Sequence, residues 1–224
     1  MIDIDALFKV SYGLYLVSSG DKDKGNGFIS NTFFQVTADP PRFASCCSKN
    51  NYTTEFMQKH GAFAASVLHT KTASEIFGKF GYQSGRDTEK MEGMNIKYGE
   101  TGVPIVLNDA IAYLECRIVQ TIDLGTHWLF IGDLVQSEVL NDELTPITYL
   151  DYRDKRKGLA PKNAPTYVDK SKYASKKTSE YAKYKCAACG YIYDEETEEI
   201  KFEDLPDNWT CPLCGSEKED FFKL

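Results

Sequence analysis

Four cysteines near the end of the chain have the spacing of a metal site. Cys186 and Cys189 form one Cys-x-x-Cys pair, Cys211 and Cys214 form a second, and 21 residues separate the pairs. Four thiolates at this spacing can close a tetrahedron around one ion, in structural zinc sites and in mononuclear iron sites alike. The spacing therefore predicts a metal centre and leaves open whether the metal is zinc or an iron that carries electrons.

The residues around these cysteines support a redox site. Gly190 and Gly215 each follow the second cysteine of a pair, where glycine can take the positive φ that turns backbone N–H groups toward sulfur. Such hydrogen bonds spread thiolate charge and tune a reduction potential. A segment of about 40 residues buries little apolar surface, so metal and aromatic rings must hold it together. The rings available are Tyr184, Tyr191, Tyr193, Phe202, Trp209, Phe221 and Phe222.

The C-terminal segment from Tyr184 onward resembles rubredoxin. The matching stretches are "YKCAACGYIYD" and "LPDNWTCPLCGSEKEDF". Rubredoxins hold one iron on four cysteines and pass single electrons, so the resemblance implies iron at Cys186, Cys189, Cys211 and Cys214. The stretch between the pairs is shorter than in many rubredoxins and lacks their usual Gly-Asn-rich loop, which affects the surface beside the site but leaves the ligands unchanged.

A one-electron carrier fused to a larger domain needs an electron source, and flavin is the usual converter of hydride into single electrons. The sequence before the cysteines has no G-x-G-x-x-G motif and no P-loop, which argues against a Rossmann or Walker nucleotide site. The range 25–53 instead carries hydroxyls, amides and one lysine, the groups that a flavin phosphate and ring require. On the residues alone, a polar loop that caps a helix remains the alternative.

Residues 1 to about 168 resemble the flavin reductase-like, FMN-binding split-barrel family. The matching stretches are "YGLYLVSS", "GNGFISNTFFQVTADPP", "KNNYTTEFMQKHGAFAASVL", "IGDLV" and "KGLAPKNAPTY". The resemblance implies a homodimer with the flavin near the subunit interface. The flavin contacts that it implies are Ser30, Asn31, Thr32 and Gln35 on a strand, and Ser48, Lys49, Asn50 and Thr53 at the phosphate end.

His127, in "LGTHWLF", lies where this family often places a histidine beside the nicotinamide site. The alternative is an ordinary hydrogen-bonded strand residue. Cys46 and Cys47, and likewise Cys116, are expected to be small buried packing residues and not redox thiols.

The whole arrangement is similar to the high-molecular-weight rubredoxins, which are NADH-dependent flavin–rubredoxin fusions. In anaerobic bacteria they supply a flavodiiron protein that reduces nitric oxide or dioxygen. The resemblance implies a route from NADH to FMN, to the rubredoxin iron and then to a flavodiiron partner. Two alternatives stay open: a stand-alone flavin or ferric reductase, and a zinc-ribbon binding protein without redox activity.

The fold expected is mainly β, a split β-barrel with short helices followed by a small rubredoxin-like domain. We expect a flavin domain at residues 1–168, a linker at 169–183 and a rubredoxin domain at 184–224. Within the barrel, the pattern predicts two strands in 27–48 joined by an Asp-Pro-Pro turn, and three consecutive strands in 105–140. It also predicts a helix at 51–61, a strand at 62–69 and a short helix at 72–85.

Composition limits the classes of protein. The chain has 224 residues, and its net charge of −7 disfavours unspecific nucleic-acid binding. No apolar run long enough to cross a membrane occurs, and the first residues lack a secretory pattern. Seven cysteines, four of them in two tight pairs, indicate a reducing compartment, and we expect the cytoplasm. The acidic C-terminal segment predicts either a basic docking face on the acceptor or solubility alone.

Overall fold

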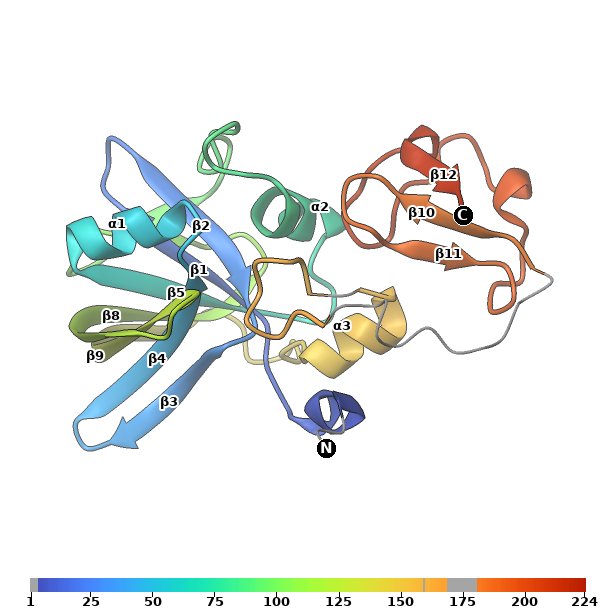
Figure 1. Cartoon of the computed structure of the whole chain (residues 1–224). Helices are drawn as coiled ribbons and strands as arrows, with labels where there is room; N and C mark the ends of the chain where they lie inside the picture. The colour runs from blue at the N-terminus through green and yellow to red at the C-terminus, as the bar shows by residue number, and fades with distance from the viewer. Residues whose placement is uncertain (1–3, 159, 169–180) are drawn as a thin grey trace.

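The computed structural model describes residues 4–158, 160–168 and 181–224, and the chain forms two parts that lie against each other (Figure 1). The first part is a curved sheet with short helices, and the second is a small three-stranded domain that contains all four predicted metal ligands. The expectation of a mainly β fold is confirmed. No helix among the described residues is long and apolar enough to cross a bilayer.

Seven antiparallel strands form the large sheet in the order β2-β1-β5-β8-β9-β4-β3. The two edge strands are consecutive in sequence, with only Asn31 and Thr32 between them, so the sheet must curve until its edges approach. This is the split barrel that the sequence predicted. The strands are β1 (Tyr15–Gly20), β2 (Gly25–Ser30), β3 (Phe33–Ala38), β4 (Pro41–Ser48), β5 (Ala62–Leu68), β8 (Ala110–Asp123) and β9 (His127–Val139).

The prediction of two strands in 27–48 is wrong, because three strands occur there. The break falls after β2, where the Ser30 hydroxyl accepts a hydrogen bond from the Thr32 backbone N–H (3.2 Å) and redirects the chain to the opposite edge. The expected turn at Asp39–Pro41 does join β3 to β4. The three strands predicted in 105–140 are confirmed as β7 (Pro104–Val106), β8 and β9, and β7 pairs with β6 (Ile96–Tyr98).

Short helices fill the gaps around the sheet. Helix α1 (Thr53–His60) begins where the Asn51 side chain accepts the Thr53 N–H at 3.0 Å, and it ends at Gly61 with φ of 61°. The predicted second helix is a single turn, α2 (Ser74–Phe77), which continues into the π-helical turn η2 (Gly78–Tyr82). The chain opens with η1 (Ile4–Lys9). The sequence did not predict α3 (Tyr149–Arg156), which starts with a Thr148–Asp151 capping box.

The C-terminal domain is a small sheet in the order β11-β10-β12. Its strands are β10 (Lys183–Cys186), β11 (Ile192–Asp194) and β12 (Phe221–Lys223), with the turns η4 (Phe202–Asp204) and η5 (Lys218–Asp220). Tyr184 stacks on Phe202 at 4.2 Å, and Trp209 meets Phe221 edge-on at 5.3 Å. The aromatic core expected from the sequence is therefore present, except for Phe222, which is 49% exposed. The predicted linker falls largely on 169–180, which lie outside the described residues.

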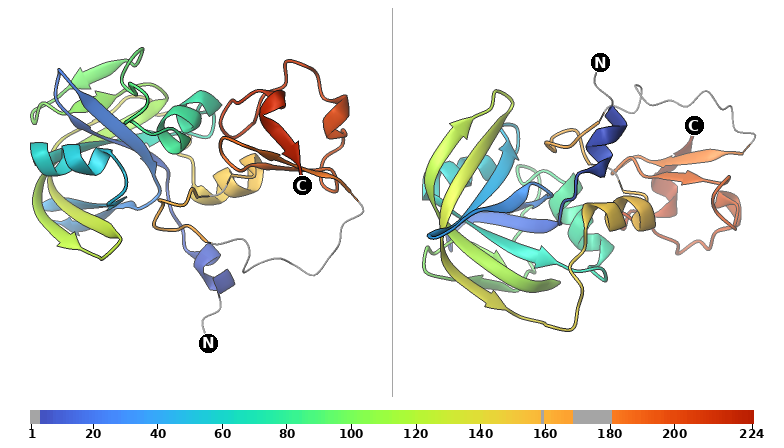
Figure 2. Two further views of the ribbon diagram at one scale, coloured as in Figure 1. Left: turned by 45° about the horizontal axis from the view of Figure 1, so that its top comes forward. Right: turned by 90° about the horizontal axis from the view of Figure 1, so that it is seen from below.

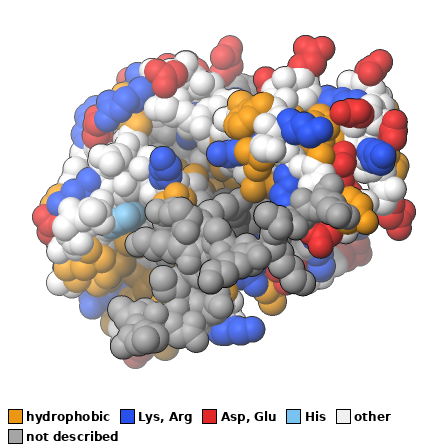
Figure 3. Space-filling view, turned by 45° about the vertical axis from the view of Figure 1, so that its right-hand side comes forward, with side chains coloured by type: hydrophobic (Ala, Val, Ile, Leu, Met, Phe, Trp, Pro, Cys, Tyr) orange, Lys and Arg blue, Asp and Glu red, His pale blue; other side chains and the backbone are white. Residues whose placement is uncertain are grey.

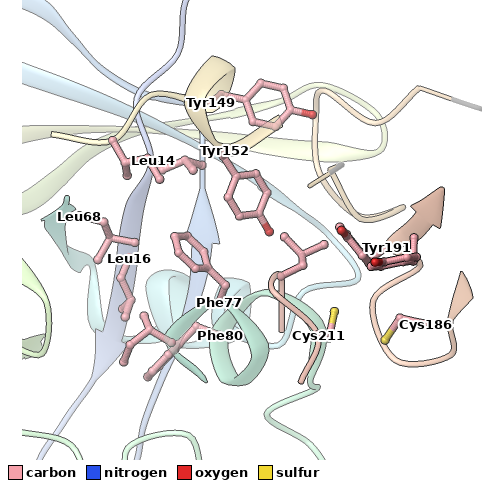
Figure 4. Close-up of a cluster of buried hydrophobic side chains, with 14 of the residues drawn as sticks. Leu14, Leu16, Leu68, Phe77, Phe80, Tyr149, Tyr152, Cys186, Tyr191 and Cys211 are labelled. Carbon is pink, nitrogen blue, oxygen red and sulfur yellow. The ribbon is translucent and has the colours of Figure 1, made fainter. Parts of the chain in front are cut away.

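One hydrophobic cluster runs through both parts of the molecule (Figure 4). It begins at Leu14 and Leu16 in the barrel, continues through Phe77 and Tyr152, and reaches Cys211 beside the metal site. The three ribbon views agree that α2 and α3 lie between the barrel and the small domain (Figures 1 and 2). The two parts are therefore packed together through a continuous apolar contact.

Candidate metal centre and flavin site

The four predicted ligands come together in space. The Sγ atoms of Cys186, Cys189, Cys211 and Cys214 all lie within 4.8 Å of one another. Two of the sulfur–sulfur distances are 3.8 Å (Cys186 to Cys214) and 3.6 Å (Cys189 to Cys211). A tetrahedral ion with metal–sulfur bonds of about 2.3 Å requires sulfur atoms about 3.8 Å apart. The arrangement therefore fits one tetrahedrally bound ion.

Backbone geometry supports thiolate charge at this site. Gly190 and Gly215 have φ of 76° and 77°, as the sequence predicted for the residue after each pair. Their conformation lets following N–H groups face sulfur: the Tyr191 N–H donates to Cys189 Sγ at 3.4 Å. The Ser216 hydroxyl lies 3.2 Å from Cys214 Sγ. These donors stabilise negative charge on sulfur and shift the reduction potential of a bound metal.

The sulfurs also compete for protons. Hydrogen bonds from Cys189 and Cys211 lower the pKa of Cys214 to about 2, while contacts with Cys211 and Cys214 raise the pKa of Cys189. A cluster of sulfurs this close cannot carry four negative charges without a cation among them. A metal ion at the centre replaces the shared protons, because thiolate is the form that binds metal. The residues thus fit an iron bound by four cysteines.

A cavity of about 710 Å³ lies between the barrel and the metal domain. Its volume falls in the range that binds small cofactors. Parts of β2 and β4, the η2 turn and residues 160–168 line most of it, and its last wall is the loop of Ala188, Cys189 and Gly190. A metal ligand thus forms part of the wall of the cavity.

Half of the predicted flavin residues line this cavity: Ser30, Asn31, Ser48 and Asn50. Asn31 also donates from its amide to the Thr166 hydroxyl at 2.7 Å, which ties the 160–168 segment over the strand. These hydroxyl and amide groups are donors and acceptors of the kind that flavin carbonyls and ring nitrogens need.

The other four predicted flavin residues do not line the cavity. Thr32 is buried behind it and donates to the Cys46 carbonyl oxygen at 3.3 Å, and Thr53 donates to Asn26 Oδ1 at 3.1 Å. Gln35 donates to the Thr37 carbonyl oxygen at 3.0 Å and lines a second cavity of about 600 Å³.

Lys49 points toward the neighbouring strands. Its Nζ pairs with Asp123 Oδ1 at 2.6 Å and lies 4.4 Å above the Trp128 ring centroid. The hydrogen bond from Lys49 lowers the pKa of Asp123. Lys49 is therefore engaged by β8 and β9 and does not line the cavity, although its neighbours Ser48 and Asn50 do.

His127 starts β9 and reaches the segment that closes the cavity. Its Nδ1 lies 2.8 Å from the Thr126 hydroxyl, and its Nε2 lies 3.3 Å from the carbonyl oxygen of Asn163. Asn163 lines the cavity, while His127 does not. His127 thus contacts a residue of the cavity wall without lining the cavity itself.

Two features of the cavity escaped the sequence analysis. Lys90 lines it with only 4% of its surface exposed, and no motif or spacing around Lys90 points to this position. Tyr82 also lines it, and its hydroxyl lies 2.9 Å from that of Tyr152 at the boundary with the metal domain. Burial raises the pKa of both tyrosines, which keeps them protonated.

The remaining cysteines behave as expected. Cys46, Cys47 and Cys116 are buried in the barrel. Burial raises the pKa of Cys47 and of Cys116 to about 12, so both are neutral thiols at physiological pH. Cys46 also has a raised pKa and contributes an apolar side of the cavity.

Comparison with known proteins agrees with both parts of the chain. The family described as flavin reductase like domain matches residues 7–160, and the rubredoxin family matches residues 183–221. A "High molecular weight rubredoxin" of Moorella thermoacetica is 39% identical and is aligned over 100% of both chains. A "Ferric-chelate reductase (NAD(P)H)" of Archaeoglobus fulgidus is 41% identical over 75% of this chain and 99% of its own length.

Among solved structures, an FMN-binding protein of Thermus thermophilus superposes with a TM-score of 0.57 and 25% identity, over 63% of this chain and 82% of its own. The cavity, its polar lining and its apolar walls fit a flavin, which this domain family binds as FMN, and the four thiolates fit the rubredoxin iron. The chain therefore belongs to the flavin reductase-like family, in the arrangement of the high-molecular-weight rubredoxins, with a rubredoxin domain at its C-terminal end.

Proposed function

We propose that this protein takes hydride from NADH onto FMN and delivers single electrons through its rubredoxin iron to a flavodiiron-type reductase of nitric oxide or dioxygen. The observation that carries the proposal is the shared cavity: the metal ligand Cys189 lines the same space as the flavin-site residues Ser30, Asn31 and Ser48. A cofactor held by those residues would share its cavity with the metal loop, so the proposed route needs no third carrier within the chain.

The residues of this chain would bind and orient the cofactor and keep water out of the cavity. Ser30, Asn31, Ser48 and Asn50 offer hydrogen bonds, while Phe28, Ile29 and Cys46 supply apolar walls. FMN, when bound, supplies the conversion of a two-electron hydride into single electrons. The Asn31–Thr166 and His127–Asn163 contacts hold the 160–168 segment across the cavity.

The burial of the four thiols supports Cys189 as the entry point for electrons. Cys186 and Cys211 are fully buried, whereas Cys189 and Cys214 are partly exposed. Of the four, Cys189 alone lines the cavity among the described residues. The fusion of both sites in one chain raises their effective concentration, so transfer does not depend on an encounter between proteins.

We also propose a cytoplasmic homodimer with domain limits at 1–168, 169–183 and 184–224. Exposed apolar side chains on the edge strand β3, Phe34 at 50% and Val36 at 40%, support a pairing surface on the barrel. Sedimentation equilibrium of the purified protein tests the dimer, and a monomer at micromolar concentration would contradict it.

Anaerobic stopped-flow spectroscopy tests the electron route. Mixing with NADH should bleach the flavin band first and the iron band second, at a rate independent of protein concentration. Adding a flavodiiron protein should then reoxidise the iron. An iron band that responds only through collisions between molecules, or a purified protein that holds zinc, would overturn the proposal.

A stand-alone ferric reductase is the second candidate, because the Archaeoglobus relative is aligned over 99% of its own length but over only 75% of this chain. In that case, removing the rubredoxin domain should leave NADH-dependent reduction of ferric chelates unchanged. On the leading proposal, the truncated chain loses its reduction of the flavodiiron acceptor.

A further inference from the structure

We infer that Lys90 is the cation that receives the phosphate group of the flavin mononucleotide, a role that family resemblance alone assigns to Lys49. The inference rests on the proposed flavin site and adds a residue to it. Its starting point is the burial of Lys90: the side chain is 4% exposed, yet it lines the cavity.

The contacts of Lys90 leave its charge without a partner of opposite sign. The ammonium group donates to the carbonyl oxygens of Gly27 at 3.1 Å and Phe80 at 3.4 Å. Among the described residues, no carboxylate lies within ion-pair distance of it. A lysine has three donors, so two carbonyls do not exhaust it. A buried cation of this kind is unfavourable unless an anion accompanies it.

Other polar groups lie beside Lys90, some of them behind the wall of the cavity. The Lys90 ammonium bonds to Gly27, and the neighbouring Asn26 receives the hydroxyl of Thr53, the first residue of α1. Ser84 and Gly85 line the cavity here, and Gly85 packs so closely on the Asn26 amide that a β-carbon would collide with it. A charged lysine beside a hydroxyl and a residue without a side chain is a setting in which proteins bind phosphate.

The other lysines fit this role less well. Lys49 is bound to Asp123 and Trp128 and does not line the cavity. Lys162 and Lys185 line it but are exposed and partly exposed, and Lys185 lies beside the metal loop. Burial also lowers the pKa of Lys90 to about 8, and a dianion nearby would restore the charged form.

The test compares two ligands that differ only in the phosphate. Apoprotein is titrated with FMN and with riboflavin by fluorescence quenching, for the wild type, Lys90→Met and Lys49→Met. We expect Lys90→Met to weaken FMN binding by about 10- to 100-fold and to change riboflavin binding less than twofold, because a charge-assisted hydrogen bond is lost. Lys49→Met should keep the FMN preference.

Three results would overturn the inference. They are an unchanged preference of Lys90→Met for FMN over riboflavin, loss of that preference in Lys49→Met, or an effect on NADH affinity alone, which would assign Lys90 to the dinucleotide.

Lys90→Gln, which keeps a hydrogen-bond donor for the Gly27 carbonyl oxygen, replaces the Met variant if that one does not fold. Lys90→Arg should retain the preference for FMN. Failure of the electron route would appear separately, as wild-type protein that binds FMN without reducing iron.

Discussion

The hydroxyl of Ser74 donates a hydrogen bond of 2.9 Å to the carbonyl oxygen of Pro212. Ser74 begins α2 of the flavin domain, and Pro212 lies between the metal ligands Cys211 and Cys214. The contact therefore fixes the metal loop directly against the domain that holds the cavity. Leu213, beside it, is 1% exposed and packs where a side chain on Gly158 would collide with it. Burial of this apolar side chain stabilises the packing of the two domains against each other.

A side chain at position 78 should separate the two domains. Gly78 lies so close to the Cys214 carbonyl oxygen that a β-carbon there would overlap it, and backbone cannot yield as a flexible side chain does. We expect Gly78→Val to slow NADH-driven iron reduction by about tenfold or more, because a small displacement of donor and acceptor lowers the rate strongly. Stopped-flow absorbance of the iron band measures it.

FMN affinity and iron content should be unchanged in Gly78→Val, because Gly78 does not line the cavity. Equal iron-reduction rates in Gly78→Val and the wild type would show that the docked contact is not the electron route.

Loss of one metal ligand should unfold the small domain and leave the barrel intact. Cys211→Ser removes a fully buried ligand, and a domain of this size depends on its metal for stability. We expect iron content to fall from about one per chain to near zero and trypsin to cleave within 183–224, while NADH still reduces FMN. Elemental analysis and limited proteolysis measure both effects. Cys116→Ala, in the barrel core, should keep its iron.

Local sequence patterns predicted the metal ligands and the strands that depend on residues close together in the sequence. The cysteine ligands are set by two tight pairs, and the alternation in 105–140 matches β7, β8 and β9, because register on a half-buried sheet follows the side-chain period. The break after Ser30 escaped prediction, since Asn31 and Thr32 read as continuous strand. Only the closing of the sheet makes the chain change edges there.

The lysines illustrate what sequence could not decide. Lys49 precedes α1, which favours a phosphate role, but β9 pairs with both β4 and β8 and brings Asp123 and Trp128 beside it. Lys90 lies in a polar stretch without periodicity, and only the path of residues 78–90 across β2 buries it. Long-range packing decided which cation faces the cavity.

Removing the buried charge of Lys90 should stabilise the flavin-free protein. Burial alone lowers its pKa to about 8, from an unfolded value near 10.5. Below pH 8 the lysine is charged in both states and the folded state bears the full penalty. Between pH 8 and 10.5 the unfolded state binds more protons, so wild-type stability rises with pH. Lys90→Met should therefore be more stable by about 1–2 kcal/mol at pH 7, after the lost hydrogen bonds are subtracted.

Urea unfolding of apoprotein at pH 7, 8, 9 and 10 checks this, and the advantage of Lys90→Met should shrink at each step above pH 8. Lys49→Met removes an exposed pair and should change stability little at any of these pH values. A Lys90→Met variant that is less stable than the wild type at pH 7 would indicate that its two carbonyl contacts outweigh the buried charge.

His127 should affect NADH more than FMN. Its Nε2 meets the Asn163 carbonyl oxygen, which positions the segment over the cavity without reaching the cavity lining itself. We expect His127→Ala to raise the KM for NADH by about 2- to 10-fold, the value of one hydrogen bond, and to change FMN affinity less than twofold. His60→Ala, on α1, is the control. A larger change in FMN affinity than in KM would assign His127 to the flavin.

The acidic rim of the rubredoxin domain should steer the external acceptor. Acidic side chains gather over this domain at the upper right of Figure 3. Glu196 and Glu199 are two exposed acidic residues of the domain. We expect Glu196→Lys/Glu199→Lys to slow electron delivery to a flavodiiron protein several-fold at low salt, with the difference vanishing near 0.5 M, about where screening becomes complete. Reduction of iron by NADH should not change, because the docked contact at Ser74 and Pro212 lies elsewhere. Asp142→Lys/Glu143→Lys alters charge equally on the barrel, and an equal slowing there would mean that net charge, and not the rim, governs the encounter.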